Sequence, residues 1–329
     1  MSQPIKSKFN NRSSALDVVQ GIDLHGKRVI VTGGAAGLGL ETSRALATTG
    51  AEVTLAVRNR DQGLAAAALL RTDTGNANIH VAQLDLADLA TVQRFADDWS
   101  DQPLHILINN AAIMASPLAR TAQGWESQFA TNHLGHFALT KALLPALKNG
   151  APSRLVALSS TGHKISSVYF DDIHFERRDY SKWKAYGQAK SANSLMSLGV
   201  HLRHSADGIT ANALHPGAIM TGLQKFLPLE EMRTLGWLKP DDTPLDIFKT
   251  PQQGASTSVW AATAMELEGK GGRYLEDCNE GLPAEPGNRV SGYSPHIMDR
   301  EAAERLWVVS EGMLASVWQS RATQLFVCS

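Results

Sequence analysis

The sequence predicts an α/β fold, in which a single domain is built on a doubly wound parallel sheet with helices on both faces. Short β-branched runs alternate with helix-length stretches, and the first run ends in a glycine cluster that opens a helix. Such alternation builds βαβ units, whose strands are parallel and whose helices cover the sheet. No repeat or low-complexity tract interrupts the pattern, so we expect one domain with a decorated C-terminal third.

Six strands are expected, each a short apolar run that stops at a turn or a polar cluster. They cover residues 28–32, 51–57, 80–84, 105–108, 154–159 and 209–214. The helices between them are expected at 41–49, 62–70 and 89–99 and within 125–148. Residues 1–25 are expected to form a tail and a short helix, with residues 1–12 disordered and Ser13 or Ser14 as the helix cap. The domain then extends over 26–320, and 321–329 is expected to be a disordered tail.

Composition excludes several kinds of partner. The 329 residues include 31 basic and 32 acidic side chains, so no field of one sign is available to attract nucleic acid or an anionic membrane. No run of 18 apolar residues occurs, which argues against a membrane span. The two cysteines, Cys278 and Cys328, make no disulfide framework, and the polar first residues lack the apolar core of a signal peptide. We therefore expect a reducing compartment and a cytoplasmic protein.

The glycine cluster after the first strand is typical of a dinucleotide-binding loop. Its glycines follow the spacing Gly-x-x-x-Gly-x-Gly, at Gly33, Gly37 and Gly39. Glycines let the backbone approach a pyrophosphate closely, and the helix N-terminus that follows offers free N–H groups and a positive dipole end. The alternative is a glycine turn that only packs a helix against a strand.

The end of the second strand indicates which cofactor would be preferred. Sites for NAD usually have an acidic residue there to bind the ribose 2′-hydroxyl, but this strand ends in Val57 and Arg58, followed by Arg60. A guanidinium suits a 2′-phosphate, so we expect NADP(H) to be preferred over NAD(H). The alternative is that both arginines are only solvated.

A tyrosine and a lysine stand four residues apart, at Tyr186 and Lys190, and would share one face of a helix. A lysine cation beside a phenol favours the phenolate, so we expect the Tyr186 pKa to be lowered and the phenol to exchange protons. Two serines, Ser159 and Ser160, end the fifth strand, where the strand ends of a doubly wound sheet line the ligand crevice.

In this order and spacing, the motifs resemble the short-chain dehydrogenase/reductase family, which has a Rossmann fold. The resemblance extends from Gly26 to about Thr221. The segments Asn132–Phe137 and Tyr274–Cys278 resemble the branch that holds retinol dehydrogenases, the WW-domain-containing oxidoreductase and their bacterial relatives. The sequence departs from the family's Asn-Asn-Ala-Gly motif at Ala112, a small change that does not threaten the assignment.

The resemblance implies a role for each motif residue. Tyr186 would be the general acid/base, Lys190 would tune it and hold the nicotinamide ribose, and Asn132 would kink its helix and anchor a water in a proton relay. The implied catalytic residues are Asn132, Ser160, Tyr186 and Lys190. The implied cofactor-binding residues are Gly33, Ala36, Gly37, Leu38, Gly39, Arg58, Asp85, Leu86, Asn110, Ala111, Tyr186, Lys190, Pro216, Gly217, Ile219 and Thr221.

The segment at about 218–250 would form a substrate lid, as the segment after Pro-Gly does in the family. Its many apolar residues and interspersed glycines and prolines suggest a mobile lid over a pocket that binds hydrocarbon. We therefore expect a bulky, mainly apolar ketone, aldehyde or secondary alcohol. The alternative is that these residues pack on the protein or form a dimer contact. The longer loop between Ser160 and Tyr186 would lie near the substrate mouth or only cover the surface.

The expected activity is that of an NADP-dependent carbonyl reductase or alcohol dehydrogenase. The alternatives are a non-catalytic, NADP-binding regulator or scaffold and, less favoured by the glycine spacing, a sugar-nucleotide epimerase. The pair His133 and His136 is spaced for a metal, as is the pair His201 and His204, but neither has a carboxylate or cysteine partner nearby, so no metal is expected. Relatives form dimers or tetramers through the helices that carry Asn132 and Tyr186, so the resemblance also implies a homodimer or homotetramer.

Overall fold

A computed structural model of the chain describes residues 3–100 and 102–327, with side chains as far as residue 316. Its centre is an eight-stranded sheet with the order β3-β2-β1-β4-β5-β6-β7-β8, in which only β7 and β8 pair antiparallel. The strands are β1 (Arg28–Thr32), β2 (Glu52–Val57), β3 (Ile79–Gln83), β4 (Ile106–Asn109), β5 (Ser153–Leu158), β6 (Ile209–His215), β7 (Tyr274–Glu276) and β8 (Asn279–Glu280). The order reverses between β1 and β4, and ligands of such sheets bind at the carboxyl ends of the strands beside this switch point.

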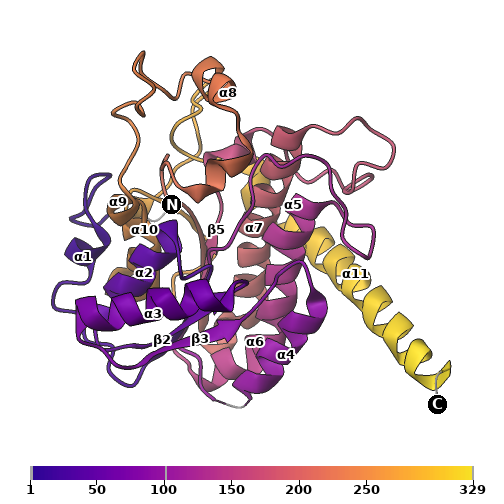
Figure 1. Cartoon of the computed structure of the whole chain (residues 1–329), viewed down its shortest axis with the longest axis horizontal. Coiled ribbons are helices and arrows are strands. Elements are labelled where there is room, and N and C mark those ends of the chain that lie inside the picture. Colours follow the sequence, from indigo (N-terminus) through magenta and orange to yellow (C-terminus); the bar gives the residue numbers. More distant parts are fainter. Residues whose placement is uncertain (1–2, 101, 328–329) are drawn as a thin grey trace.

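Helices cover both faces of the sheet, with α2 and α3 on one side and α4, α6 and α7 on the other (Figure 1). The longer helices are α2 (Gly37–Thr48), α3 (Arg60–Thr74), α4 (Leu89–Trp99), α6 (Gly135–Asn149), α7 (Lys182–His204), α10 (Ser256–Thr263) and α11 (Arg300–Val327). Successive residues of β1 alternate between the two cores, because Val29 and Val31 pack with α2, α3 and α10 whereas Ile30 packs with α4, α6 and α7.

Short helical turns connect and decorate these elements. They are α1 (Ala15–Val18), α5 (Ser127–Phe129), the π-helical turn η1 (Ala130–Leu134), η2 (Thr161–Lys164), η3 (Ser205–Asp207), η4 (Gly222–Phe226), α8 (Leu229–Thr234), α9 (Pro251–Gly254), η5 (Met265–Leu267) and η6 (Pro295–Met298). Elements α5, η1 and α6 follow one another without a break, so η1 interrupts one continuous helical stretch.

The structure confirms the α/β class, the parallel sheet and all six predicted strands, whose bounds differ by only a residue or two. The sequence did not predict β7 and β8, which have 3 and 2 residues. Helix α2 begins at Gly37, four residues before the predicted helix, because the last two glycines of the cluster already belong to its first turn. The domain bounds at residues 26 and 320 stay predictions.

The N-terminal segment differs from the disordered start that we expected for residues 1–12. The Ile5 N–H donates to the Glu280 carboxylate at 2.9 Å, and the Glu280 N–H donates to the Ile5 carbonyl at 2.9 Å. The Ser7 N–H donates to Asn279 Oδ1 at 3.0 Å, and Phe9 packs on the core that contains α2. Pairing with β8 therefore orders this segment. Ser14 caps α1 as expected.

None of the helices described here is long and apolar enough to cross a bilayer. The side chains from residue 317 on lie outside the described part of the chain, and with them the segment 321–329 for which we expect a disordered tail.

Candidate active site

The glycine cluster forms an open helix N-terminus at the end of β1. Gly33 and Gly37 adopt positive φ angles of 65° and 53°, and Ala36 precedes α2 without a side chain that could cap its N–H groups. A Cβ at Gly39 would lie 2.2 Å from the Gly33 carbonyl oxygen. The loop is therefore closed to side chains but open to a ligand, and its N–H groups and helix dipole suit a pyrophosphate.

The turn after β4 is held against this loop by Thr32. The Thr32 hydroxyl oxygen accepts the N–H groups of Asn110 at 2.9 Å and Ala111 at 3.0 Å. The Asn110 side-chain amide donates to the Thr32 carbonyl at 2.7 Å, and a Cβ at Gly33 would lie 3.2 Å from the Ala111 Cβ. Asn110 and Ala111 thus form a wall beside the glycine loop.

Two further cofactor candidates follow β3 at the same edge of the sheet. The half-buried Asp85 accepts the Ala87 N–H at 3.0 Å, while its backbone N–H and carbonyl both pair with the Thr91 hydroxyl. Leu86 is buried against α6, where a Cβ at Gly135 would lie 2.2 Å from the Leu86 carbonyl oxygen. The backbone positions of both residues are therefore fixed by neighbouring helices.

Arg58 follows β2 directly and is exposed. Among the residues that the structure describes it has no ion-pair partner, and the cap of α3 is supplied by Asn59, whose side chain accepts the Gln62 N–H at 3.0 Å. Arg60, the first residue of α3, is exposed as well. A free guanidinium at this strand end can bind an added phosphate without first breaking a protein contact.

Helix α7 brings Tyr186 and Lys190 to the end of β5. The Lys190 ammonium donates to the Leu158 carbonyl at 2.9 Å and lies 5.7 Å from the centroid of the Tyr186 ring. The two serines have different partners: Ser159 donates its hydroxyl to the Lys190 carbonyl at 2.9 Å, whereas Ser160 faces Tyr186. Of the two serines, Ser160 is therefore the one that lies beside the phenol.

Gly162 explains how the ring of Tyr186 fits beside Ser160. A Cβ on Gly162 would lie 2.8 Å from Tyr186 Cε1, so any larger residue would displace the ring. The Gly162 N–H donates to Ser160 Oγ at 3.0 Å, which orients that hydroxyl. The sequence analysis did not single out Gly162, because nothing local distinguishes it from an ordinary turn glycine.

Our prediction that the Tyr186 pKa would be lowered is wrong for this structure. Burial raises the pKa of Tyr186 to about 12, although a hydrogen bond with Ser160 acts in the opposite direction. Burial also lowers the pKa of Lys190 to about 7. The lysine exerts little pull on the phenol because its ammonium is directed to the Leu158 carbonyl, and desolvation of both groups prevails. The phenol is therefore protonated at neutral pH.

Asn132 lies within η1, the π-helical turn between α5 and α6. Its side-chain amide binds the backbone of Ile113 twice, since Oδ1 accepts the Ile113 N–H at 2.8 Å and Nδ2 donates to the Ile113 carbonyl at 2.9 Å. π-Helical turns inside α-helices are frequent at functional sites. The Asn132 carbonyl accepts a hydrogen bond from the His136 side chain at 2.9 Å.

The segment after β6 faces the glycine loop. Thr221 caps η4 through the Leu223 N–H and lies beside Gly37, where a Cβ would be 3.5 Å from the Thr221 side chain. Gly217, which follows Pro216, has a positive φ of 104°. Ile219 is buried and pairs with the far end of the predicted lid in an isolated bridge to Lys249.

The sequence analysis missed an ion pair at this position, between a buried lysine and a partly exposed aspartate. The Lys249 ammonium lies 2.5 Å from Asp277 Oδ1, and its side chain crosses Gly217, where a Cβ would be 2.7 Å from Lys249 Cδ. Asp277 belongs to the Tyr274–Cys278 motif, to which the sequence analysis assigned no role. Only the folded chain brings Lys249 and Asp277, 28 residues apart, together.

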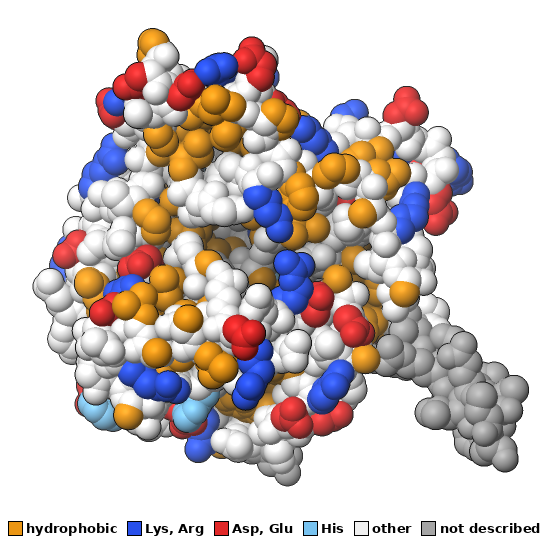
Figure 2. Space-filling view, in the orientation of Figure 1, with side chains coloured by type: hydrophobic (Ala, Val, Ile, Leu, Met, Phe, Trp, Pro, Cys, Tyr) orange, Lys and Arg blue, Asp and Glu red, His pale blue; other side chains and the backbone are white. Residues whose placement is uncertain are grey.

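Some of the apolar side chains of the predicted lid pack around Tyr186, while others stay exposed. One hydrophobic cluster joins Met114, Ala115, Tyr186, Leu227, Trp183, Leu223, Met232 and Trp237. Figure 2 shows hydrophobic side chains gathered on the upper part of this face, where Figure 1 shows α8. The Glu231 carboxylate ties the lid to α7 by accepting hydrogen bonds from Lys182 at 2.5 Å and from the Trp183 indole at 3.2 Å.

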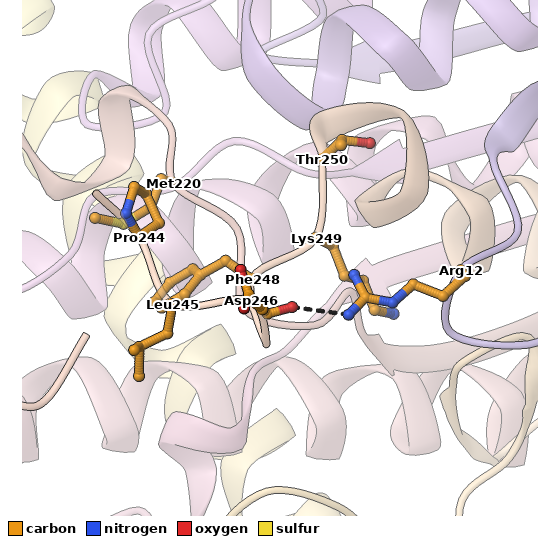
Figure 3. A pocket seen from close by; sticks show the side chains of 8 residues that line it. All are labelled: Arg12, Met220, Pro244, Leu245, Asp246, Phe248, Lys249 and Thr250. Carbon is orange, nitrogen blue, oxygen red and sulfur yellow. Dashed lines mark hydrogen bonds between the residues drawn. The ribbon is translucent and has the colours of Figure 1, made fainter. Parts of the chain in front are cut away.

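A cavity of about 470 Å³ lies between the far end of the lid and the N-terminal segment (Figure 3). Its lining residues are Arg12, Met220, Pro244, Leu245, Asp246, Phe248, Lys249 and Thr250. The Arg12 guanidinium donates to the Asp246 carbonyl at 2.7 Å, so the N-terminal segment holds the base of the lid.

The long loop between Ser160 and Tyr186 reaches the apolar cluster at its far end. There the Tyr180 hydroxyl donates to the Ser116 carbonyl at 2.9 Å, next to Ala115, and Trp183 follows at the start of α7. The earlier part of the loop folds around Asp172, whose carboxylate accepts three backbone N–H groups.

The paired histidines have separate partners. His133 contacts the Ser310 hydroxyl at 2.9 Å, whereas His136 contacts Thr32 at 2.9 Å. His204 pairs with Asp207 at 2.9 Å. Within the described residues, no group of three or more His, Cys, Asp or Glu side chains is placed to hold a metal ion.

Comparisons with known proteins agree with this architecture. Residues 27–231 match the model of the short chain dehydrogenase family. A Streptomyces lividans protein described as "Probable oxidoreductase" is 47% identical over 290 residues, which cover 87% of this chain and 97% of that protein. Retinol dehydrogenase 12 from Homo sapiens is 38% identical over 302 residues, covering 91% of this chain and 89% of that protein. A solved structure of an uncharacterized protein from Mycobacterium paratuberculosis has a TM-score of 0.70 and 33% identity, and the match covers 92% of this chain and 97% of that one.

The matched residues span more than half of the chain and contain the glycine loop, the strand ends and the Tyr186–Lys190 pair. The human relative confirms the resemblance to retinol dehydrogenases. The chain belongs to the short-chain dehydrogenase/reductase family, and it is an NAD(P)-dependent oxidoreductase that acts on CH–OH or C=O groups.

Proposed function

We propose that this enzyme is an NADP(H)-preferring carbonyl reductase or alcohol dehydrogenase whose substrates are bulky, mainly apolar ketones, aldehydes or secondary alcohols. The observation that carries the proposal is the cluster in which Tyr186 packs with lid side chains, including Leu227 and Trp237. A substrate bound at the phenol would replace these contacts with its own apolar surface, at about 25 cal/mol per Å² buried. The name of the human relative, retinol dehydrogenase 12, fits a mainly apolar alcohol.

The residues at the strand ends fit a dinucleotide. The glycine loop and the uncapped start of α2 would hold the pyrophosphate, the Asn110–Ala111 wall would lie along the adenosine, and Thr221 would lie near the nicotinamide carboxamide. The bound nicotinamide would supply the hydride. The exposed Arg58 would pair with a 2′-phosphate, which only NADP carries.

The proton chemistry would be performed by residues of α7 and the end of β5. The raised pKa of Tyr186 keeps its phenol protonated at neutral pH, so the hydroxyl can donate its proton to a carbonyl oxygen as that oxygen gains charge. Ser160, oriented by the Gly162 N–H, would hydrogen-bond the same oxygen. Lys190, whose ammonium donates to the Leu158 carbonyl, would hold the nicotinamide ribose rather than set the pKa of the phenol.

A non-catalytic NADP-binding scaffold is the alternative that we considered from the sequence. A pure binder needs neither a buried lysine beside a buried phenol nor a serine oriented towards that phenol. Ser160 follows β5, Tyr186 and Lys190 lie on α7 beside it, and Asn132 lies in η1. Catalysis is therefore the better-supported proposal.

The substrate proposal is tested by kcat/KM measured with NADPH across ketones of rising apolar size. Efficiency should rise with size, and Trp237→Ala should flatten the rise because it removes a large side chain from the lid cluster. Leu229→Ala is a matched control, since Leu229 lies in the lid but is 44% exposed and outside that cluster. A preference for short, charged or sugar-like substrates would contradict the proposal.

The catalytic and cofactor assignments are tested separately. Tyr186→Phe should reduce turnover at least about 100-fold, the usual range for loss of a general acid/base, while NADPH binding measured by fluorescence titration stays nearly unchanged. NADP(H) should bind at least about tenfold more tightly than NAD(H), and Arg58→Ala should narrow this gap. Near-full turnover in the first variant, or equal affinities in the unmutated enzyme, would overturn the respective assignment.

A further inference from the structure

His136 is buried at the junction of the reaction centre and the cofactor wall. It lies on α6, one helical turn after Asn132, and both of its ring nitrogens have partners. Nδ1 is 2.9 Å from the Asn132 carbonyl oxygen, and Nε2 is 2.9 Å from the Thr32 hydroxyl. The two partners belong to different parts of the site, because Asn132 lies in η1 and Thr32 ends β1.

The hydrogen bonds define the state of the ring. A carbonyl oxygen can only accept, so Nδ1 carries the proton and Nε2 accepts from the Thr32 hydroxyl. The same hydroxyl oxygen accepts the N–H groups of Asn110 and Ala111. Its other acceptor, the Ile108 carbonyl, is more distant at 3.3 Å. Burial lowers the pKa of His136 to about 4, which keeps the ring neutral and this pattern intact at neutral pH.

We propose that His136 is a positioning residue that joins Asn132 to the Asn110–Ala111 wall. One arm, the Nδ1–H, fixes the Asn132 carbonyl. The other arm, Nε2, fixes the Thr32 hydroxyl and through it the backbone of the wall. This inference rests on the proposed function, because Asn132 and the wall matter for turnover only if they serve the reaction and the cofactor as proposed.

The link has kinetic importance because small displacements are costly in a preorganised site. A shift of about 1 Å in a catalytic geometry can cost about 100-fold in rate. The backbone hydrogen bonds of η1 are π-helical rather than α-helical. Among the described residues, the His136 side chain donates its Nδ1–H to the Asn132 carbonyl. Without that donor, the Asn132 carbonyl loses a fixed partner, while the side-chain amide keeps its two bonds to Ile113.

Two substitutions separate the arms. Asparagine carries its amide nitrogen at the δ position, as histidine carries Nδ1, whereas glutamine carries its amide at the ε position, near Nε2. His136→Asn should keep the link to Asn132 and lose the link to Thr32. His136→Gln should do the reverse, and His136→Ala should lose both.

The experiment measures NADPH affinity by fluorescence titration, kcat at saturating NADPH and the melting temperature of each variant. We expect His136→Gln to keep its NADPH affinity within about threefold and to lose at least about tenfold in kcat. We expect His136→Asn to keep kcat within about threefold and to bind NADPH at least about fivefold more weakly. His136→Ala should show both losses.

Equal effects of the asparagine and glutamine variants on both quantities would overturn the proposal. So would lower melting temperatures with unchanged kcat and affinity, since these indicate a purely structural histidine. If His136→Ala does not fold, the His136→Asn and His136→Gln variants decide the proposal alone, because each keeps one of the two links, and a loss of NADPH affinity in the glutamine variant or of kcat in the asparagine variant would refute it. Tyr186→Phe separates the failure of the proposed function from the failure of the positioning role. If Tyr186→Phe is active, the proposed function is refuted. If Tyr186→Phe is inactive and His136→Ala has normal kcat and NADPH affinity, only the positioning role is refuted.

Discussion

Acid should destabilise this enzyme through its buried histidines, and His133 allows the effect to be measured at one residue. His133 lies in η1 and is buried against α11, and burial lowers its pKa from 6.5 to about 3. Four others are shifted in the same direction by burial, with the pKa of His136, His163 and His174 lowered to about 4 and that of His215 to about 3.

The magnitude follows from proton linkage. Between the two pKa values the unfolded chain holds a proton on His133 and the folded protein does not, so acidification favours unfolding. The contribution of His133 to the free energy of unfolding is fully present above about pH 6.5. As the pH falls from there towards 3, this contribution decreases by about 1.4 kcal/mol per pH unit. From about pH 7.5 to about pH 5, His133 alone should cost about 2 kcal/mol, a large part of the 5–15 kcal/mol typical of a domain.

The assay compares urea unfolding of the unmutated enzyme and His133→Gln at several pH values in this range. Glutamine can still reach Ser310 but does not titrate, so its free energy of unfolding should fall about 2 kcal/mol less on acidification. Ser310→Ala is the matched control, because it removes the partner and keeps the titrating ring, and its curve should stay parallel to that of the unmutated enzyme. If the free energy of unfolding of His133→Gln changes with pH in parallel with that of the unmutated enzyme, the reasoning is refuted.

Three other predictions address the loop, the serines and the lid. Gly39→Ala, whose new Cβ would collide with the Gly33 carbonyl, should weaken NADPH binding at least about tenfold in a fluorescence titration. Ser159→Ala should lower the free energy of unfolding by about 1 kcal/mol through its lost bond to Lys190, whereas Ser160→Ala should mainly lower kcat. Glu231→Gln should weaken the lid's contact with α7, and limited proteolysis should then cleave within 218–250 faster than in the unmutated enzyme.

Local signals sufficed for six of the eight strands and for naming the candidate site residues. Each of the six predicted strands is a contiguous apolar run, and the glycine loop, the Tyr186–Lys190 pair and the two serines are each encoded within a few residues. The parallel sheet then brings these segments to one edge, because the carboxyl ends of its strands meet there.

Features that depend on distant partners could not be predicted in this way. Residues 5–7 lack any strand signal and are ordered by β8, some 270 residues away. The raised pKa of Tyr186 arises from burial by the lid and by η2, which no local pattern discloses. Likewise, the sequence shows His136 only as a histidine three residues after His133. The packing of α6 against the end of β1 then gives it Thr32 as a partner in addition to Asn132.

The packing of α11 affects how the enzyme is completed during synthesis. Its first turns cover α6 and α7: the Trp307 ring lies edge-on to Phe137 at 4.9 Å, a Cβ at Gly199 would be 3.2 Å from that ring, and Glu311 pairs with Lys141. The chain leaves the ribosome N-terminus first, so α7 is synthesised about 100 residues before the part of α11 that covers it. A nascent chain that stalls before α11 would expose the side of α7 that Trp307 covers to chaperones and proteases.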